Sequence, residues 1–568
     1  MKNYFGIDFE KQREALLKSN VVRTIVQDII EKADAAIEKT YLPIKMSEFM
    51  LFYETGDRSF YEKKYYERRY DCAYMSAALW LTEDKKYIKP LIDTIFIICD
   101  EYTWCLPAHA NMDKDPSPEL IVNWIDLANS ETSKILTEIA VLIGDKLPKY
   151  VNERIAFELR RRIIEGLKNE RYGWSKSTSN WAAVCGGSSG SVLLHFGTEE
   201  EIKLIMPKIY KAMDNFLIGY ENDGCCREGV GYWSYGFGHF LYFARLIHTY
   251  TNGEKNYFTS EKVRNIALFF QKIRMGNRKA YCMSDSMQDY YTDVKNLSFL
   301  RQIYGKDILY PEISLSNHDD NIYSLTGLLW LDTEYKEDTW PAGITCFEDA
   351  QIYIKRTARY SFAAKGGTNG EPHNHNDIGS FMIVDSNDNI PILDPGKCQY
   401  NRDSFDPEKR YTIFVNGSQG HSVPIINGKY QVEGIENKAE NVEMGEDFFS
   451  LDIQGGYEDG LINKIHRTFK FGEDSVVMTD EFDLSDNTES ICERFISQNI
   501  PEIEDGTVTL GKTKLLFEKG EYNVDFGNAS YKLSDREKNE KEKTVYYVDF
   551  KKCNGLPTKF KIEIKITE

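Results

Sequence analysis

Three of the nine histidines in this chain lie close together between residues 373 and 421, with an aspartate among them. His373 and His375 are two residues apart, and in an extended segment such side chains point the same way, so both can face one site. Imidazole and carboxylate are ordinary ligands of Zn²⁺ and Mn²⁺, and His375, Asp394 and His421 would supply three protein ligands with room for water. His373 would then be left for proton transfer. The alternative is a set of loop histidines with local hydrogen bonds, because the spacings match no short metal motif.

A run of small residues follows Asn180 and Trp181 and extends to Gly190. An asparagine amide at this place could bind the carboxylate of a sugar, and an indole could stack on a sugar ring. The small residues allow close backbone approach. The alternative interpretation is that the glycines serve helix packing.

A second cluster, rich in aromatic residues, lies between Asp223 and His239. Tyr232, Tyr235 and His239 are separated by helical spacings of three and four, so one face of a helix could present all three. The alternative is an aromatic stripe in a hydrophobic core. The chain has 36 tyrosines, and most of them must be structural.

Two kinds of hydrophobic periodicity divide the chain and change near residue 340. Over residues 11–330 the pattern is helical, and one charged segment carries apolar residues at every fourth position, namely Ile155, Leu159, Ile163 and Leu167. We expect helices arranged in hairpins. A chain of 568 residues is too long for one ordinary core, so two or three domains are expected.

After Gly343 the apolar runs shorten and turn residues recur, as at Ser386–Asn389. The last strand is the clearest, because apolar residues alternate with Lys and Glu over Phe560–Ile566. We therefore predict an α+β multidomain protein. Helices occupy residues 1–338, and a mostly antiparallel β domain occupies residues 339–568.

Composition and charge exclude several classes of protein. No apolar run approaches the roughly 18 residues of a membrane span, so no membrane partner is expected. The net charge of −19 argues against nucleic acid and would repel an anionic polymer at long range. An acidic substrate must therefore be received by a local basic groove.

The expected compartment follows from the N-terminus and the cysteines. The N-terminus lacks a basic start followed by an apolar stretch, so no signal peptide is expected, and the 11 cysteines show no repeated spacing, which fits reduced thiols. The expected location is cytoplasmic, or periplasmic or secreted if a leader was trimmed. Nothing in the sequence predicts an oligomeric state.

Three motifs together resemble the heparinase II/III-like polysaccharide lyases. They are Asn180-Trp181 with Ala-Val-Cys-Gly-Gly after it, Glu228-Gly-Val-Gly-Tyr-Trp-Ser-Tyr235, and His373-Asn-His-Asn-Asp-Ile-Gly-Ser-Phe381 leading to Leu393-Asp-Pro-Gly396. The resemblance covers most of the chain. It implies an N-terminal (α/α) toroid, an incomplete barrel, followed by a C-terminal antiparallel β-sandwich.

The resemblance also implies catalytic residues. Asn180 would bind the uronate carboxylate, and His373 would open the β-domain motif. Tyr235 would be the acid/base, with Tyr232 as the second choice, because the interval from Asn180 to Tyr235 matches the family better. Many relatives have a second asparagine where this chain has Ala182, so binding of the carboxylate needs additional groups.

The remaining residues implied by the resemblance bind metal or substrate. His375, Asp394 and His421 would hold a divalent metal, Zn²⁺ or Mn²⁺, in a structural role. A loop from Trp104 to Asn111 looks like a substrate-facing loop of the toroid, and the alternative is a turn that ends a helix. The expected substrate-binding residues are His109, Trp181, Arg227, His239, Arg402 and Arg410.

The implied reaction is β-elimination at a uronic acid. Once the carboxylate is neutralised, Tyr235 or His373 would take the C5 proton, and the tyrosine would protonate the departing O4. The expected substrate is an acidic polysaccharide, a glycosaminoglycan such as heparan sulfate, hyaluronan or chondroitin. The alternatives are a lyase for alginate or another uronate saccharide, an (α/α) toroid glycoside hydrolase that uses Asp223 and Glu228, and a non-catalytic carbohydrate-binding protein.

Overall fold

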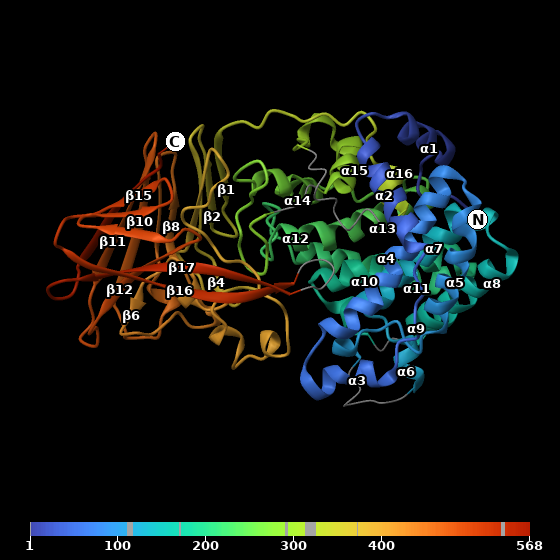
Figure 1. Cartoon of the computed structure of the whole chain (residues 1–568), viewed down its shortest axis with the longest axis horizontal. Coiled ribbons are helices and arrows are strands. Elements are labelled where there is room, and N and C mark those ends of the chain that lie inside the picture. Colours follow the sequence, from blue (N-terminus) through green and yellow to red (C-terminus); the bar gives the residue numbers. More distant parts are fainter. Residues whose placement is uncertain are drawn as a thin grey trace.

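The computed structural model describes residues 2–110, 118–169, 172–289, 293–312, 325–371, 373–534 and 540–567. Helices fill the part of the chain that ends at Trp330, and strands fill the part that begins at Gly343. The two parts lie side by side along the long axis of the molecule, the helices in blue to green and the strands in yellow to red (Figure 1). The predicted boundary between residues 338 and 339 falls in the segment that joins them, and a division into domains at that point remains a prediction.

The helical part is built from helices that pack on their sequence neighbours, as α4 does on α5 and α10 on α11. The four periodic residues predicted to be helical are fully buried. No helix in the described ranges is both long and apolar enough to cross a bilayer. In chain order the described α-helices are α1 (Phe9–Lys18), α2 (Arg23–Ala36), α3 (Met46–Thr55), α4 (Ser59–Thr82), α5 (Ile88–Asp100), α6 (Pro118–Asn123), α7 (Leu127–Leu142), α8 (Lys149–Leu159), α9 (Glu165–Asn169), α10 (Asn180–Phe196), α11 (Glu199–Ile218), α12 (Val230–Tyr232), α13 (Gly238–Tyr250), α14 (Glu261–Lys272), α15 (Val294–Tyr304) and α16 (Leu325–Trp330).

Helix α10 is buried along nearly its whole length and packs against α7, α11 and α13. Its glycines make this possible. A Cβ atom on Gly187 would stand 2.9 Å from the backbone oxygen of His239, and one on Gly190 would stand 2.5 Å from the ring of Phe243. The structure thus confirms the packing interpretation of the small residues. The close contact with α13 also places Asn180, the first residue of α10, beside the segment that carries the predicted tyrosines.

The β part consists of antiparallel sheets. The largest sheet has the strand order β13-β14-β15-β18-β11-β10-β9-β8, and smaller sheets have the orders β1-β2-β3-β5, β16-β17-β12-β6 and β4-β7. The strands are β1 (Gly343–Phe347), β2 (Ile352–Arg356), β3 (Tyr360–Lys365), β4 (Thr368–Asn369), β5 (Phe381–Asp385), β6 (Ile425–Ile426), β7 (Gly434–Lys438), β8 (Glu440–Met444), β9 (Phe448–Asp452), β10 (Lys464–Phe471), β11 (Ser475–Asp483), β12 (Ile491–Ser497), β13 (Pro501–Glu504), β14 (Thr507–Leu510), β15 (Thr513–Leu516), β16 (Tyr522–Ser534), β17 (Glu540–Lys552) and β18 (Lys559–Lys565).

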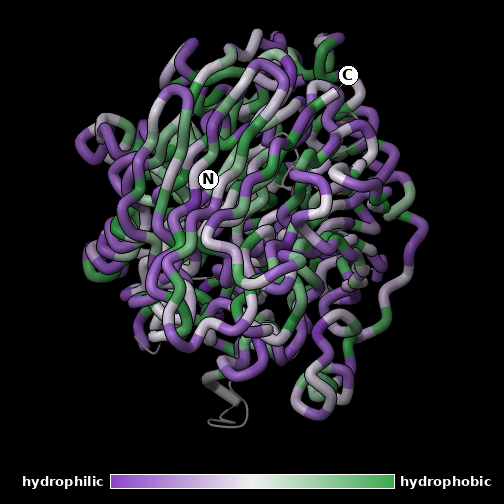
Figure 2. Tube along the Cα trace, turned by 90° about the vertical axis from the view of Figure 1, so that its left-hand side faces the viewer, coloured by the Kyte–Doolittle hydropathy of each residue, from purple (hydrophilic) through white to green (hydrophobic). Residues whose placement is uncertain are grey.

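The predicted last strand is confirmed as β18. It lies between β11 and β15, and its apolar side chains from Phe560 to Ile564 are buried while the alternate Lys and Glu residues are more exposed. Figure 2 looks onto this β part and shows hydrophobic and hydrophilic residues intermixed along the strands. One face of such a sheet packs on the core and the other meets water.

The two parts of the molecule share a hydrophobic core. Tyr531 of β16 and Val545 of β17 belong to the same buried cluster as the helical residues. From the same hairpin, Lys543 donates to the side-chain oxygen of Gln288 at 2.6 Å. This shared core holds the loops of the β part against the segments that follow α11 and α14, where the candidate site lies.

Candidate active site and metal centre

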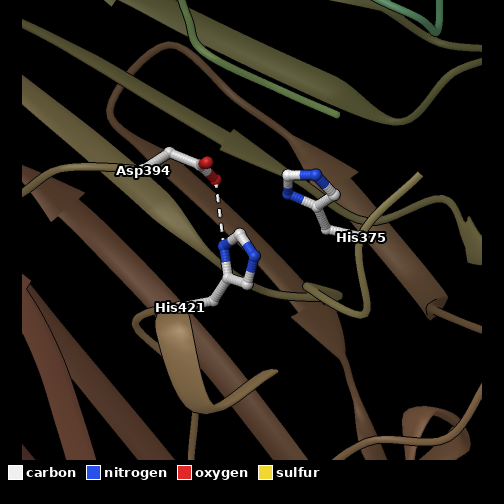
Figure 3. A group of neighbouring side chains, drawn as sticks. All are labelled: His375, Asp394 and His421. Atoms are coloured by element: carbon white, nitrogen blue, oxygen red, sulfur yellow. Dashed lines mark hydrogen bonds and ion pairs between the residues drawn. The ribbon is translucent and has the colours of Figure 1, made fainter. Parts of the chain in front are cut away.

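His375, Asp394 and His421 converge at one point inside the β part (Figure 3). They come from three separate segments: the loop before β5, the segment after β5, and the residue that follows a 3₁₀ turn at Ser418–Gly420. All three side chains are buried, and one potential ligand atom of each lies within 4.8 Å of the other two. These residues could hold a metal ion.

The hydrogen bonds of the two histidines leave nitrogen atoms available to a metal. His421 Nε2 donates to the carbonyl oxygen of Val415 at 3.0 Å, and Nδ1 donates to Asp394 at 3.1 Å. Burial opposes protonation of this ring, but Asp394 raises its pKa, so a metal would take the place of the Nδ1 proton. His375 Nε2 donates to Asp285 at 3.1 Å, and its buried Nδ1 has no hydrogen-bond partner among the described residues. Metal-bound histidines are held in this way, with the second ring nitrogen donating to a carbonyl or a carboxylate. The donor set therefore fits a divalent metal.

Asp285, a buried residue of the helical part, accepts hydrogen bonds from four side chains of the β part. Oδ1 accepts from His375, and Oδ2 accepts from His373 at 2.9 Å, Tyr400 at 2.8 Å and Arg410 at 3.1 Å. Burial opposes ionisation, but the hydrogen bonds from His373 and His375 hold the pKa of Asp285 well below its ordinary value. Asp285 is therefore an anion shared by the candidate metal centre and its neighbours. Sequence reasoning missed it because it lies in a segment without a motif or periodicity.

His373 lies in a turn with a φ of +56°, so the extended segment predicted for His373 and His375 is wrong. The two side chains still meet, because both donate to Asp285. With Nδ1–H donating to the carboxylate, the neutral ring of His373 has its lone pair on Nε2. The side chain is 25% exposed, so Nε2 can accept a proton from a bound molecule.

Tyr232 lies against His373. The two rings stack with their centroids 4.6 Å apart, and the Tyr232 hydroxyl lies 2.8 Å from the hydroxyl of Tyr400. Because Tyr400 donates its proton to Asp285, Tyr232 donates to Tyr400. Burial, and then the charge of Asp285, raises the pKa of Tyr232, which keeps the phenol protonated. Tyr400 was not predicted, since no spacing distinguishes it from the other tyrosines.

Tyr235 lies in a different environment from Tyr232. Helix α12 passes directly into a π-helical turn, Trp233–Phe237, before α13 begins. A π-helical turn is wider than an α-helical one, so it changes the direction of Tyr232, which precedes it, relative to Tyr235. Tyr235 packs on His239 with ring centroids 5.2 Å apart, and both line a cavity inside the helical part together with residues such as Glu131, Lys134 and Lys295. The prediction that Tyr232 shares one helix face with Tyr235 and His239 is therefore wrong.

Asn180 is paired with a carboxyl group. Its Nδ2 donates to Glu228 Oε2 at a long distance of 3.4 Å. Burial raises the pKa of Glu228 to about 6, Asp285 acts in the same direction, and His373 opposes it. An amide and a carboxyl group that is easily protonated thus lie together at the start of α10.

Trp181 and His109 form a second contact near the start of α10. Their rings pack edge to face with centroids 4.9 Å apart, and His109 Nδ1 donates to Asp126 at 2.7 Å. Pro107–His109 forms a 3₁₀ turn, and Asn111 lies outside the described residues. The ring contact holds the loop against α10, and the hydrogen bond holds it against the start of α7.

The three arginines predicted to bind substrate are held by protein groups in different places. Arg227 pairs with Glu221 at 3.0 Å and with Glu371. Arg402 donates to two backbone oxygens of α3 at 3.0 and 3.1 Å. Arg410 is one of the four donors to the shared aspartate. The structure therefore brings Arg410 to the candidate site and uses Arg227 and Arg402 in contacts between the helical and β parts.

An (α/α) toroid followed by an antiparallel β-sandwich is the fold of the heparinase-like polysaccharide lyases, and this chain has that fold. A structure of heparinase III is similar with a TM-score of 0.61 and 15% identity, over 89% of this chain and 77% of that one. Heparan sulfate lyase HepC from Pedobacter heparinus gives a TM-score of 0.59 at 12% identity, over 98% of this chain and 87% of that one. A second heparinase III structure gives 0.61 at 14% identity, over 99% and 93%. No protein-family model and no curated protein sequence matches the chain. These likenesses confirm the predicted fold class.

Proposed function

We propose that this protein is a polysaccharide lyase that cleaves a uronic-acid-containing glycosaminoglycan by β-elimination. The observation that carries the proposal is the set of contacts at the junction of the two parts. Asn180 donates to Glu228 at the start of α10, and His373 of the β part stacks on Tyr232 and donates to Asp285 of the helical part. The heparinase-type fold supports the same reaction class.

The carboxylate of the uronate would be received by Asn180 and Glu228. The C5 proton is weakly acidic until this carboxylate is neutralised, because negative charge builds on the carboxylate as C5 loses its proton. The amide of Asn180 would donate to one oxygen, and protonated Glu228 would donate to the other. Glu228 would thereby supply the second hydrogen-bond donor to the carboxylate, which Ala182 lacks the side chain to provide.

His373 and Tyr232 would carry the proton transfers. Nε2 of His373 holds the lone pair that can take the C5 proton, because Nδ1–H is committed to Asp285. Tyr232 keeps its proton, since burial and Asp285 raise the pKa of the phenol, and it can give that proton to the departing O4. The electron pair of the C5–H bond becomes the new C4–C5 double bond, and the C4–O4 bond breaks. The products are an unsaturated uronate and a new hydroxyl, and no water is consumed.

We assign the metal a structural role in this scheme. His375, Asp394 and His421 would hold Zn²⁺ or Mn²⁺, which suit two imidazoles and a carboxylate. The bound ion would supply a cross-link between three loops of the β part. The loop that carries His375 also carries His373, so the cross-link would steady the base.

The proposed substrate is a glycosaminoglycan, with heparan sulfate tested first. The similar structures include a heparan sulfate lyase and heparinase III, and this likeness of fold supports that order of testing. The purified protein is incubated separately with heparan sulfate, hyaluronan, chondroitin sulfate and alginate, with and without a chelator. Ultraviolet absorbance of the conjugated uronate should rise with at least one polymer. New reducing ends without that absorbance would instead indicate a hydrolase. If neither absorbance nor reducing ends appear, catalysis on these polymers is contradicted.

The choice between the two tyrosines is tested with a matched pair of variants. Tyr232→Phe removes the hydroxyl beside His373, and we expect turnover to fall by about 10²–10⁴-fold, the usual contribution of a general acid or base. Tyr235→Phe removes a hydroxyl in the helical cavity and should retain turnover. Loss of turnover in Tyr235→Phe with turnover kept in Tyr232→Phe would return the role to Tyr235.

A further inference from the structure

Asp285 divides its two carboxylate oxygens between the candidate base and the candidate metal centre. Oδ2 accepts from His373 Nδ1 at 2.9 Å, and Oδ1 accepts from His375 Nε2 at 3.1 Å. In Figure 3 the other ring nitrogen of His375 faces Asp394 and His421. Asp285 therefore binds one ring nitrogen of each histidine. It leaves the other nitrogen of His373 for proton transfer and the other nitrogen of His375 for the metal.

We propose that Asp285 is a positioning residue that couples the metal centre to the base, so that the orientation of His373 and the metal affinity of His375 depend on the same carboxylate. The part of this inference that concerns the base rests on the proposed function. The part that concerns the metal does not.

The position of Asp285 is set by the residues that directly follow it. Lys397 N–H donates to the carbonyl oxygen of Ser286 at 3.0 Å, and Gln288 donates to the carbonyl oxygen of Asp394 at 2.7 Å. At Gly396, where φ is +66°, a Cβ atom would stand 2.3 Å from the same Ser286 oxygen. The turn of the helical part is thus docked on the segment that carries a metal ligand, and Asp285 cannot shift without disturbing that segment.

The charge of Asp285 suits this task. Four donors converge on it, and one of them, Arg410, balances its charge at 3.1 Å while also donating to the backbone oxygen of Asn374 at 3.0 Å. An amide in place of the carboxylate would offer one acceptor oxygen and a competing NH₂ group with two N–H donors. At least one of the two histidines would then lose its partner, and with it the tautomer that its task requires.

The metal is tested directly by calorimetry. Zn²⁺ is titrated into metal-stripped wild type, Asp285→Asn and the control Asp452→Asn. Asp452 is also a buried carboxylate that accepts from a histidine, His466 at 2.6 Å, but it lies in β9 outside the site. We expect Asp285→Asn to weaken Zn²⁺ binding by about 10–100-fold, the usual effect of removing a group that orients a metal ligand. Asp452→Asn should bind like the wild type.

The base is tested by kinetics on whichever uronate polymer the wild type cleaves. We expect Asp285→Asn to lower kcat by about 10²-fold or more with KM within a few-fold of wild type, because the base is misoriented while the substrate contacts remain. Asp285→Glu keeps the charge and should recover part of kcat. Thermal unfolding of each variant shows whether it is folded.

The outcomes separate the inference from the proposed function. Unchanged Zn²⁺ affinity in Asp285→Asn, or no Zn²⁺ binding by the wild type, overturns the coupling to the metal. Equal kinetic losses in Asp285→Asn and Asp452→Asn reduce Asp285 to a structural residue and overturn the coupling to the base. If the wild type cleaves no uronate polymer by elimination, the proposed function fails while the calorimetry still decides the metal arm.

Discussion

In the proposed mechanism, the binding of an acidic substrate depends on the ionisation of Glu228. When protonated it can donate to the uronate carboxylate beside Asn180, and when ionised it repels that carboxylate. Because the pKa of Glu228 is raised to about 6, we expect KM for a uronate polymer to rise as the pH increases through that value. Glu228→Gln should remove this dependence. Initial rates from pH 5 to pH 8 measure it, and the exposed Glu502→Gln is the control.

The raised pKa of Glu228 also makes the stability of the folded protein depend on pH. The folded-state pKa of about 6 lies above the ordinary value of 4.5, so the folded protein binds the proton more tightly than the unfolded chain in that interval. Stability falls as the pH rises from 4.5 to 6. Glu228→Gln should therefore raise the free energy of unfolding by about 1–2 kcal/mol at pH 7 and leave it nearly unchanged at pH 4. An equal gain at both pH values would contradict the assignment.

Some residues of the candidate site were predicted from the sequence, and others were not. His375, Asp394 and His421 were grouped by a family resemblance, and the structure brings them together. Asp285 and Tyr400 could not be found in this way, because their importance arises from contacts with His373 across long stretches of chain. No local pattern encodes such a contact.

At the scale of elements, helix α10 depends on residues that are too small to keep helices apart. In Gly187→Ala the new methyl group would stand 2.9 Å from the backbone oxygen of His239. A backbone atom cannot relieve such a clash by a change of rotamer. Overpacking costs about 1–3 kcal/mol, against about 1 kcal/mol returned by better helix propensity. We expect a net loss on the order of 1 kcal/mol in chemical denaturation.

The matched control for Gly187→Ala is Gly231→Ala in α12. A Cβ atom on Gly231 has no neighbour within 4 Å, and the residue is exposed. This substitution should be neutral or stabilising by up to about 1 kcal/mol. If both variants change stability equally, close packing of α10 on α13 is not the cause.

Elements were predicted where periodicity is regular and were missed where it changes. The helices and β18 follow from repeats of about four and two residues, because burial of one face imposes those repeats. The π-helical turn at Trp233–Phe237 follows no such rule. It begins directly after Tyr232, so helical spacing alone wrongly placed Tyr232 on the same face as Tyr235.

At the scale of the whole molecule, Arg227 and Glu371 form an ion pair between the helical and β parts just before the His373 turn. Their side chains are 21% and 9% exposed, so solvent screens the pair weakly. A double-mutant cycle of Arg227→Met and Glu371→Gln should give a coupling energy of about 1–3 kcal/mol in unfolding. The more exposed pair Arg264–Asp307, within the helical part, should give less than about 1 kcal/mol.

Steady-state kinetics on the same variants separates the two roles of Arg227. If it acts through the ion pair, Arg227→Met and Glu371→Gln should lower kcat/KM to a similar extent. A rise in KM in Arg227→Met alone would support direct substrate binding, as the sequence analysis expected.

The shared core and the donors that meet at Asp285 also govern the order in which the protein can mature. Tyr232 and Asp285 emerge from the ribosome before His373, His375, Tyr400 and Arg410 have been synthesised. At about 5–20 residues per second, the nascent helical part waits roughly five seconds or more with a carboxylate that has none of its native donors. The helical surface that Tyr531 and Val545 cover is exposed to solvent until the β16–β17 hairpin has been synthesised, so the junction that carries the candidate site is completed only then.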